Sequence, residues 1–224
     1  MATVVEEAAY SGNDEVRELP GDEHVLLRGI SWSTYEALVR EIEGHRRLFL
    51  TYDDGDLEIM SPSSKHEWGK VLIGRMVEAY TEEFGIPICS LGSTTFKLEI
   101  QHKGLEPDEC YYLQHEAQVR GKDDLNLGDD PPPDLAIEVD VAKRVLRRLP
   151  IYAALGFPEV WQFVRSEIKV HLLGAEGAYV IGRQSACLPQ LPLEKLEEFL
   201  RQRGETDETT WIRSFRAWVR TLAS

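Results

Sequence analysis

Residues 131 to 140, PPPDLAIEVD, combine three prolines, a short apolar segment and acidic side chains at alternating positions. Because side chains along a strand alternate between its two faces, Asp134, Ala136, Glu138 and Asp140 are predicted to share one face. The opposite face is then apolar and carries Leu135, Ile137 and Val139. Unpaired buried carboxylates are very costly, so the acidic face must open onto water, a cation or basic side chains.

A further acid could join this face from elsewhere in the chain. Asp108 follows Pro107 and precedes the apolar segment ECYYL, just as Asp134 follows Pro133. Two carboxylates on one strand and a third from a neighbouring strand would form an oxygen-rich site that suits Mg²⁺ or Mn²⁺. The alternative is that Asp134 is a turn residue and that Glu138 and Asp140 line a solvated sheet face.

Helices and strands that would position these acids are visible in the hydrophobic periodicity. Ser33 and Glu36 fit a capping box at the start of the first helix, and Gly85 would end the longest one. The turn at residues 53 to 55 reads Asp-Asp-Gly and predicts a hairpin. Helices are expected at 34–44, 65–85, 142–156, 193–204 and 206–223, and strands at 24–31, 47–52, 56–60, 87–91, 94–100, 109–113, 134–140, 159–164, 167–173 and 178–182.

This order of elements predicts an α/β or α+β protein with a mixed sheet flanked by helices. Residues 1–23 are polar and acidic, and we expect a flexible arm there. The main domain would span residues 24–190, and residues 191–224 would form a C-terminal helical extension packed on it. Residues 116–133 form a polar loop that is long enough to be a flap or a functional loop.

The composition restricts the class of protein. The 224 residues are 42% hydrophobic, which suits one domain with a sizeable core. There are 39 Asp and Glu against 25 Lys and Arg, a formal net charge of -14, so the surface as a whole repels polyanions. Three cysteines without metal-type spacing, no apolar run of about 18 residues and an acidic N-terminus favour a cytoplasmic protein without a membrane span.

Several stretches of the chain resemble the PD-(D/E)xK nuclease superfamily and, within it, the Uma2-like restriction endonucleases. The specific matches are DGDLEIMSPSSKH, EPDE and IYAALGFPEVW, and the likeness covers most of residues 25 to 175. The resemblance implies a restriction-endonuclease-like mixed β-sheet flanked by helices, with extra N-terminal strands and C-terminal helices. It also implies metal-dependent hydrolysis of DNA phosphodiester bonds.

Carried over residue by residue, the resemblance assigns Asp108 to the aspartate of PD and Glu138 to the acid of (D/E)xK. Both would bind Mg²⁺ or Mn²⁺, together with the carbonyl oxygen of Val139. One or two ions would then polarise the scissile phosphate and activate a water for in-line attack. No organic cofactor is implied.

The sequence departs from the superfamily at the lysine, because Asp140 stands two residues after Glu138. In Uma2-like proteins the basic residue moves to the following helix, which here gives Arg148, four residues before Tyr152. Lys143 and Arg144 are the alternatives. Arginine is effectively always protonated, so it can hold a phosphate but is a poor general base.

Other residues have both a functional and a structural interpretation. His66 could reach the metal or the phosphate, or it could be a hydrogen-bonded histidine at a helix start. Glu58 could add an acid near the cation, or it could lie on the exposed face of a hairpin. Arg144, Arg147 and Arg148 form a local basic cluster that could bind phosphate groups.

Two functions compete on this sequence. The first is a Mg²⁺-dependent DNA endonuclease, expected to be a homodimer so that two sites address both strands. The second is a catalytically inactive relative that keeps the fold as a binding or regulatory module. Asp108 and Glu138 favour the first function, whereas Arg148 and the net charge of -14 favour the second.

Overall fold

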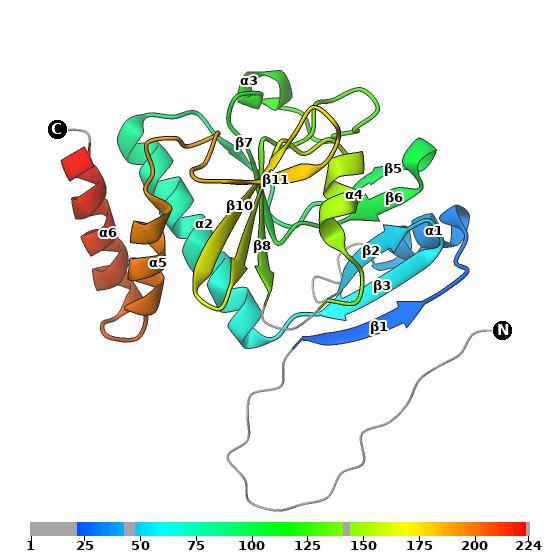
Figure 1. Ribbon diagram of the computed structural model, residues 1–224, viewed down its shortest axis with the longest axis horizontal. Coiled ribbons are helices and arrows are strands. Elements are labelled where there is room, and N and C mark those ends of the chain that lie inside the picture. The colour runs from blue at the N-terminus through cyan, green and yellow to red at the C-terminus, as the bar shows by residue number, and fades with distance from the viewer. Residues whose placement is uncertain (1–21, 43–47, 141–143, 223–224) are drawn as a thin grey trace, which may run out of the picture.

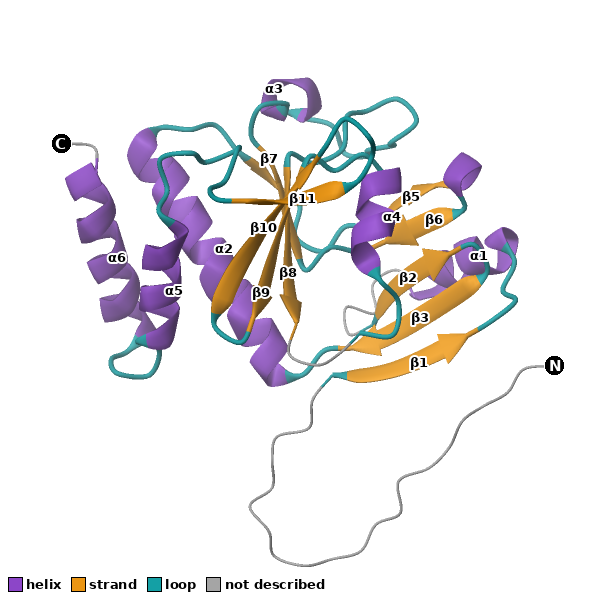
Figure 2. Ribbon diagram, in the orientation of Figure 1, coloured by secondary structure: helices purple, strands orange, loops and turns teal. Residues whose placement is uncertain are grey.

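The computed structural model describes residues 22–42, 48–140 and 144–222. It is a mixed α+β fold with two β-sheets flanked by helices (Figures 1 and 2). Among the described helices, none is long and apolar enough to cross a membrane.

The first sheet is antiparallel and has the strand order β1-β3-β2-β6-β5. Helix α1 (Trp32–Ile42) packs on it through Trp32 and Tyr35. A 3-10 turn (Glu99–Gln101) connects its last two strands. The strands are β1 (Glu23–Leu27), β2 (Phe49–Asp53), β3 (Asp56–Ser61), β5 (Phe96–Leu98) and β6 (Lys103–Leu105).

The second sheet has the order β11-β10-β9-β8-β7-β4, and its one parallel pair is β8 with β9. On one face lie α2 (Ser64–Phe84), α5 (Leu193–Arg201) and α6 (Glu208–Leu222), and on the other lies α4 (Arg148–Ala154) (Figure 1). A short helix, α3 (Glu116–Val119), lies in the 116–133 loop. The strands are β4 (Cys89–Ser90), β7 (Glu109–Tyr112), β8 (Leu135–Asp140), β9 (Glu159–Val164), β10 (Glu167–Leu173) and β11 (Tyr179–Gly182).

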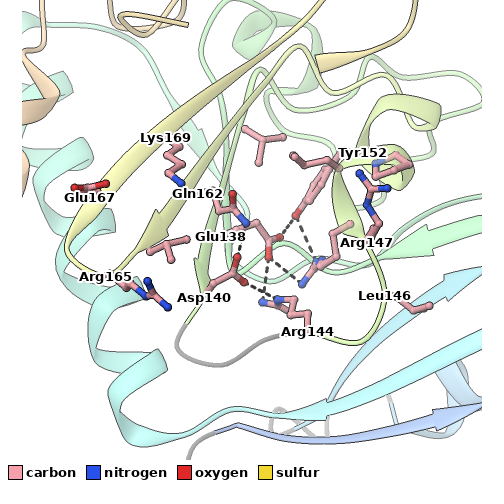
Figure 3. Close-up of a pocket in the computed structure, with 15 residues that line it drawn as sticks. Glu138, Asp140, Arg144, Leu146, Arg147, Tyr152, Gln162, Arg165, Glu167 and Lys169 are labelled. Carbon is pink, nitrogen blue, oxygen red and sulfur yellow. Dashed lines mark hydrogen bonds and ion pairs between the residues drawn. The ribbon is translucent and has the colours of Figure 1, made fainter. Parts of the chain in front are cut away.

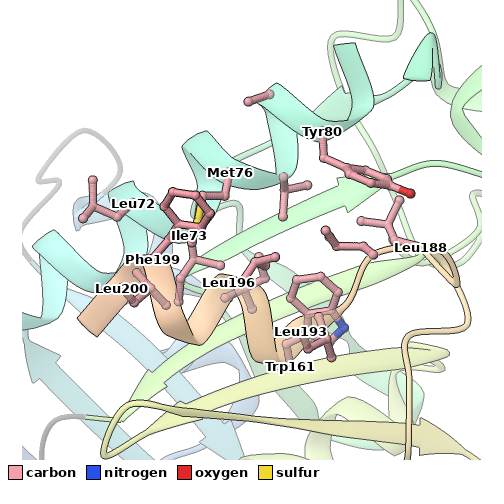
Figure 4. Close-up of a cluster of buried hydrophobic side chains, with 14 of the residues drawn as sticks. Leu72, Ile73, Met76, Tyr80, Trp161, Leu188, Leu193, Leu196, Phe199 and Leu200 are labelled. Atoms are coloured by element: carbon pink, nitrogen blue, oxygen red, sulfur yellow. The ribbon is translucent and has the colours of Figure 1, made fainter. Parts of the chain in front are cut away.

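The long helix α2 forms as the sequence predicts. Ser63 accepts a hydrogen bond from the His66 amide at 3.3 Å, and Gly85 ends the helix in the left-handed region at φ 62°. Figure 4 shows its apolar side chains against those of α5 and the sheet, including Leu72, Met76 and Phe199. This core fixes one face of β8.

A second core lies beneath α4 and joins the two sheets. It contains Ala136 from β8, Tyr152 from α4, and Phe96 and Leu105 from β5 and β6. Because α4 packs between the sheets, the segment before it must pass close to both of them.

Three details of the sequence prediction were wrong. Strand β6 was missed because its three residues, Lys103–Leu105, are too short to show alternation. The first helix is capped by Ser31 rather than Ser33, since Ser31 Oγ accepts from the Thr34 amide at 3.2 Å. Gly44, its expected end, lies outside the described residues.

The third detail is the basic helix expected at 142–156, which begins only at Arg148. Residues 144–147 form an irregular segment instead, and residues 141–143 lie outside the described part of the chain. Pro150 thus falls in the first turn of α4, where its missing N–H removes no intrahelical hydrogen bond. The arginines of this region therefore occupy different kinds of structure.

Candidate active site

Strand β8 shows the alternation that the sequence predicts. Leu135, Ile137 and Val139 pack in the core under α2, while Ala136 packs in the core under α4. Glu138 and Asp140 follow Ala136 on the same face and line a cavity of about 800 Å³ between β8, β9, β10 and the start of α4 (Figure 3). This cavity is the candidate active site.

Glu138 is 4% exposed and is surrounded by cationic and hydroxyl groups. Its Oε2 lies 3.0 Å from Arg144 Nη2 and 3.1 Å from Arg148 Nη1, and Tyr152 donates its hydroxyl hydrogen to Oε1. Burial, opposed by Arg148 and reinforced by Asp108, raises the pKa of Glu138 to about 7. Among the described residues, Oε2 has these ion pairs but no well-aligned hydrogen bond.

Asp108 reaches the same place from the start of β7 and is fully buried. Its Oδ2 accepts a 2.7 Å hydrogen bond from the Val139 amide, and its Oδ1 lies 3.0 Å from His66 Nε2. Burial raises the pKa of Asp108, but Arg144, His66 and Arg148 outweigh burial and leave it below its ordinary value. Asp108 is therefore ionised at neutral pH.

Arg144 lies between the two buried acids. Its Nη2 is 3.3 Å from Asp108 Oδ2 and 3.0 Å from Glu138 Oε2, and its Nε donates to Asp140 at 3.0 Å. Burial lowers the pKa of Arg144, but the three carboxylates raise it above its ordinary value, so the side chain stays charged. One cationic nitrogen thus contacts both Asp108 and Glu138, which shows that the carboxylates converge on a position for a cation.

Glu58 holds the irregular segment that carries Arg144. Its carboxylate accepts hydrogen bonds from the Val145 and Leu146 amides at 2.9 and 3.2 Å, and it lies 2.8 Å from His24 Nδ1. The side chain is buried, so the alternative of an exposed hairpin residue is wrong. Strand β3 of the first sheet therefore tethers the segment in front of the cavity through Glu58.

His66 connects Asp108 to a second carboxylate. The ring is fully buried, with Nε2 beside Asp108 and Nδ1 3.2 Å from Asp22 Oδ2. Burial lowers the pKa of His66, but its two carboxylate partners outweigh burial and raise it to about 9. The imidazole is therefore protonated at neutral pH and compensates part of the negative charge.

This pKa predicts how the stability of the metal-free protein depends on pH. A histidine with a folded-state pKa of about 9, against 6.5 when unfolded, stabilises the fold fully below pH 6.5. That contribution, about 3 kcal/mol at 1.36 kcal/mol per pKa unit, is lost as the pH rises through 9. Urea denaturation in EDTA across this range should show the loss in the wild-type chain but not in His66→Gln. Parallel curves for the two proteins would contradict the assignment.

Asp134 lies at the other end of β8 from the carboxylate pair. Its Oδ2 accepts hydrogen bonds from the Leu113 and His115 amides at 2.7 and 3.0 Å, and Oδ1 lies 2.5 Å from His115 Nδ1. The structure does not bring it to Asp108 or Glu138. It fixes the loop after β7 instead.

The remaining basic candidates are separated by the irregular segment. Arg148 is buried beside Glu138 and donates to the Glu106 carbonyl, whereas Arg147 is exposed at the cavity wall. Lys143 lies outside the described residues. The three arginines thus do not form one surface cluster, since Arg144 and Arg148 are turned toward carboxylates.

Sequence reasoning missed the side chains of β9, β10 and their turn that line the same cavity, among them Gln162, Arg165 and Lys169. Gln162 pairs across strands with Glu138 on one side and with Lys169 on the other, and it donates to Asp140. The only local signal for these three side chains is the alternation of apolar and polar residues in β9 and β10. Whether they lie beside Glu138 depends on the order of the strands in the sheet, which alternation does not specify.

The donor set fits a hard divalent ion with few protein ligands. Asp108 and Glu138 provide carboxylate oxygens, and Glu138 Oε2 has no aligned hydrogen-bond donor among the described groups. Within the described ranges, three or more His, Cys, Asp or Glu side chains nowhere gather closely enough to enclose a metal. Mg²⁺ commonly uses only one or two protein carboxylates and keeps several waters, so this set suits it.

A mixed sheet flanked by helices, with two buried acids meeting from adjacent strands, is consistent with the restriction-endonuclease-like class of proteins. The chain belongs to the Uma2 family. The family model, described as "Putative restriction endonuclease", matches residues 32–203. No curated protein matches the chain.

Proposed function

We propose that this chain is a Mg²⁺- or Mn²⁺-dependent DNA endonuclease, with Asp108, Glu138 and the carbonyl oxygen of Val139 as metal ligands. The observation that carries the proposal is the convergence of both carboxylates on one nitrogen of Arg144. Family membership supports a nuclease. When bound, such an ion neutralises charge at the scissile phosphate and lowers the pKa of a bound water.

The protein side chains around the acids have separate roles in this proposal. Arg148, 3.1 Å from Glu138, keeps a permanent positive charge at the edge of the cavity and stabilises the phosphate. Tyr152 and Arg148 together fix the orientation of Glu138. His66 and the Val139 amide fix Asp108. No side chain has to act as a general base if the nucleophile is an activated water.

A second candidate function is supported by the position of Arg144. A guanidinium between the two acids balances their charge without any metal, as expected of an inactive relative that only binds a partner. The two functions differ in whether a divalent ion can replace this contact.

We propose further that the active form is a cytoplasmic homodimer, because a two-fold axis would direct two sites at the two strands of a duplex. Light scattering of the purified chain tests this directly, and a monomer that still linearises plasmid would contradict it.

The proposed function is tested by incubating the purified chain with supercoiled plasmid and Mg²⁺ or Mn²⁺. We expect nicked and then linear DNA with either ion and none in EDTA. Calorimetric titration with Mn²⁺ alone should show binding at the Mn²⁺ concentrations that support nicking. Binding of neither ion, with intact plasmid, would favour the inactive module.

A further inference from the structure

The wall of the cavity formed by the β9–β10 hairpin carries charges that the carboxylate site does not use. Arg165 lies in the turn, and Lys169 lies on β10 next to Gln162. Arg147 lies on the opposite wall, with Glu138 and Asp140 between the two walls (Figure 3). Cations therefore lie on both sides of Glu138 and Asp140, which form the carboxylate floor of the cavity.

These three cations differ from the buried arginines because they lack acidic partners. Arg144 and Arg148 form ion pairs with the cavity acids. Among the described residues, no carboxylate lies within ion-pair distance of Arg147, Arg165 or Lys169, and all three side chains are exposed. Three exposed cations without described acidic partners therefore line one cavity on a chain with a net charge of -14.

The turn that presents Arg165 has a disfavoured backbone. Arg165 and Ser166 have φ values of 51° and 72°, the left-handed conformation that Asn and Gly adopt most easily in two-residue hairpins. Nothing in the local backbone favours arginine at this position. The hairpin turn accounts for the left-handed backbone, so the arginine at this position, rather than asparagine or glycine, is what remains to be explained.

We propose that Arg165 and Lys169 on one wall and Arg147 on the other hold the phosphodiester backbone of a polynucleotide across the carboxylate floor. This rests on the proposed function and names how the substrate is held. Phosphate oxygens would otherwise be repelled by Glu138 and Asp140, and cations on both walls offset that repulsion. Phosphate contacts position the strand and read no sequence, so binding through this hairpin is sequence-independent.

The test is Arg165→Asn, alone and combined with Lys169→Gln. Affinity for a fluorescein-labelled DNA duplex is measured by anisotropy in Ca²⁺ over a series of salt concentrations. We expect affinity to fall about tenfold for the single variant. The slope of the logarithm of the binding constant against the logarithm of the salt concentration should become shallower by about one for each cation removed. Because Asn suits the left-handed turn, Arg165→Asn should leave the melting temperature unchanged or raise it. A melting temperature that is unchanged or raised would exclude a folding defect as the cause of weaker binding.

The matched control is Arg213→Gln on α6, which removes one exposed charge far from the cavity and should leave affinity unchanged. Equal affinity and equal salt dependence for wild type and Arg165→Asn would overturn the proposal, as would wild-type protein that does not bind DNA. The proposed function is judged separately by plasmid nicking. If the wild type nicks plasmid and Arg165→Asn binds DNA normally, the proposed nuclease function stands and the proposed role of the hairpin in binding DNA is wrong.

Discussion

Glu138→Gln should abolish metal-dependent nicking, lowering the rate at least about 100-fold. The substitution keeps the size of the side chain and an oxygen that can accept the Tyr152 hydroxyl, but it removes the negative charge. Replacing a group that only supports a metal ligand typically lowers metal affinity or activity 10- to 100-fold. Loss of a ligand itself should therefore lower the activity at least about 100-fold. The rate of conversion of supercoiled plasmid in Mn²⁺ is the measurement.

A matched control exists in the same cavity. Glu167 lies on β10, lines the same cavity and is exposed, and no described cation lies within ion-pair distance of it. Glu167→Gln is therefore the same chemical change without loss of a proposed ligand, and it should nick no more slowly than wild type. If both variants nick equally, the activity does not depend on Glu138, and the assignment of the site is wrong.

Arg144→Gln should destabilise the metal-free protein by about 3–5 kcal/mol, the usual effect of removing one partner from a buried ion pair. The loss is large because Asp108, Glu138 and Asp140 all contact this guanidinium. Only 9% of the side chain is exposed, so water screens these contacts little. Urea denaturation in EDTA measures the free energy of unfolding for both proteins.

Mn²⁺ should restore much of this stability, because the acids freed by Arg144→Gln converge on one position for a cation. A ligand that binds only the folded state at 100 times its Kd adds about 2.7 kcal/mol. We expect Mn²⁺ to stabilise Arg144→Gln more than wild type, and to bind it more tightly in calorimetry, because no guanidinium competes. Equal stabilisation of the two proteins would show that Arg144 and the ion do not share these oxygens.

The control for Arg144 is an arginine on the surface. Arg120 pairs with Glu116 on α3 and is 66% exposed, so water screens the pair and Arg120→Gln should change the free energy of unfolding little. Its stability should also not respond to Mn²⁺ beyond the wild-type response. The contrast separates a buried cation at the acidic site from an ordinary surface ion pair.

Local features of the fold were predictable because they depend on residues a few positions apart. The alternation of β8, the Asp-Asp-Gly hairpin and the capped helix α2 are all present as predicted. Elements with weak local signals were harder. Strand β6 has only three residues, and the start of α4 lies behind a segment whose apolar spacing resembles a helix.

The order of residues along the chain is enough to place acids on one face of β8 and to show the Uma2 motifs. Which of the acids meet depends on how the strands pack in three dimensions. Asp108 and Val139 are 31 positions apart, and the pairing of β7 with β8 brings them into contact while leaving Asp134 at the far end of the strand. Tertiary packing also turns Arg144 toward the acids, because Glu58 of the other sheet binds the backbone amides of the next two residues. Strand register and long-range tethers of this kind are set by the packing of distant segments, which no local pattern specifies.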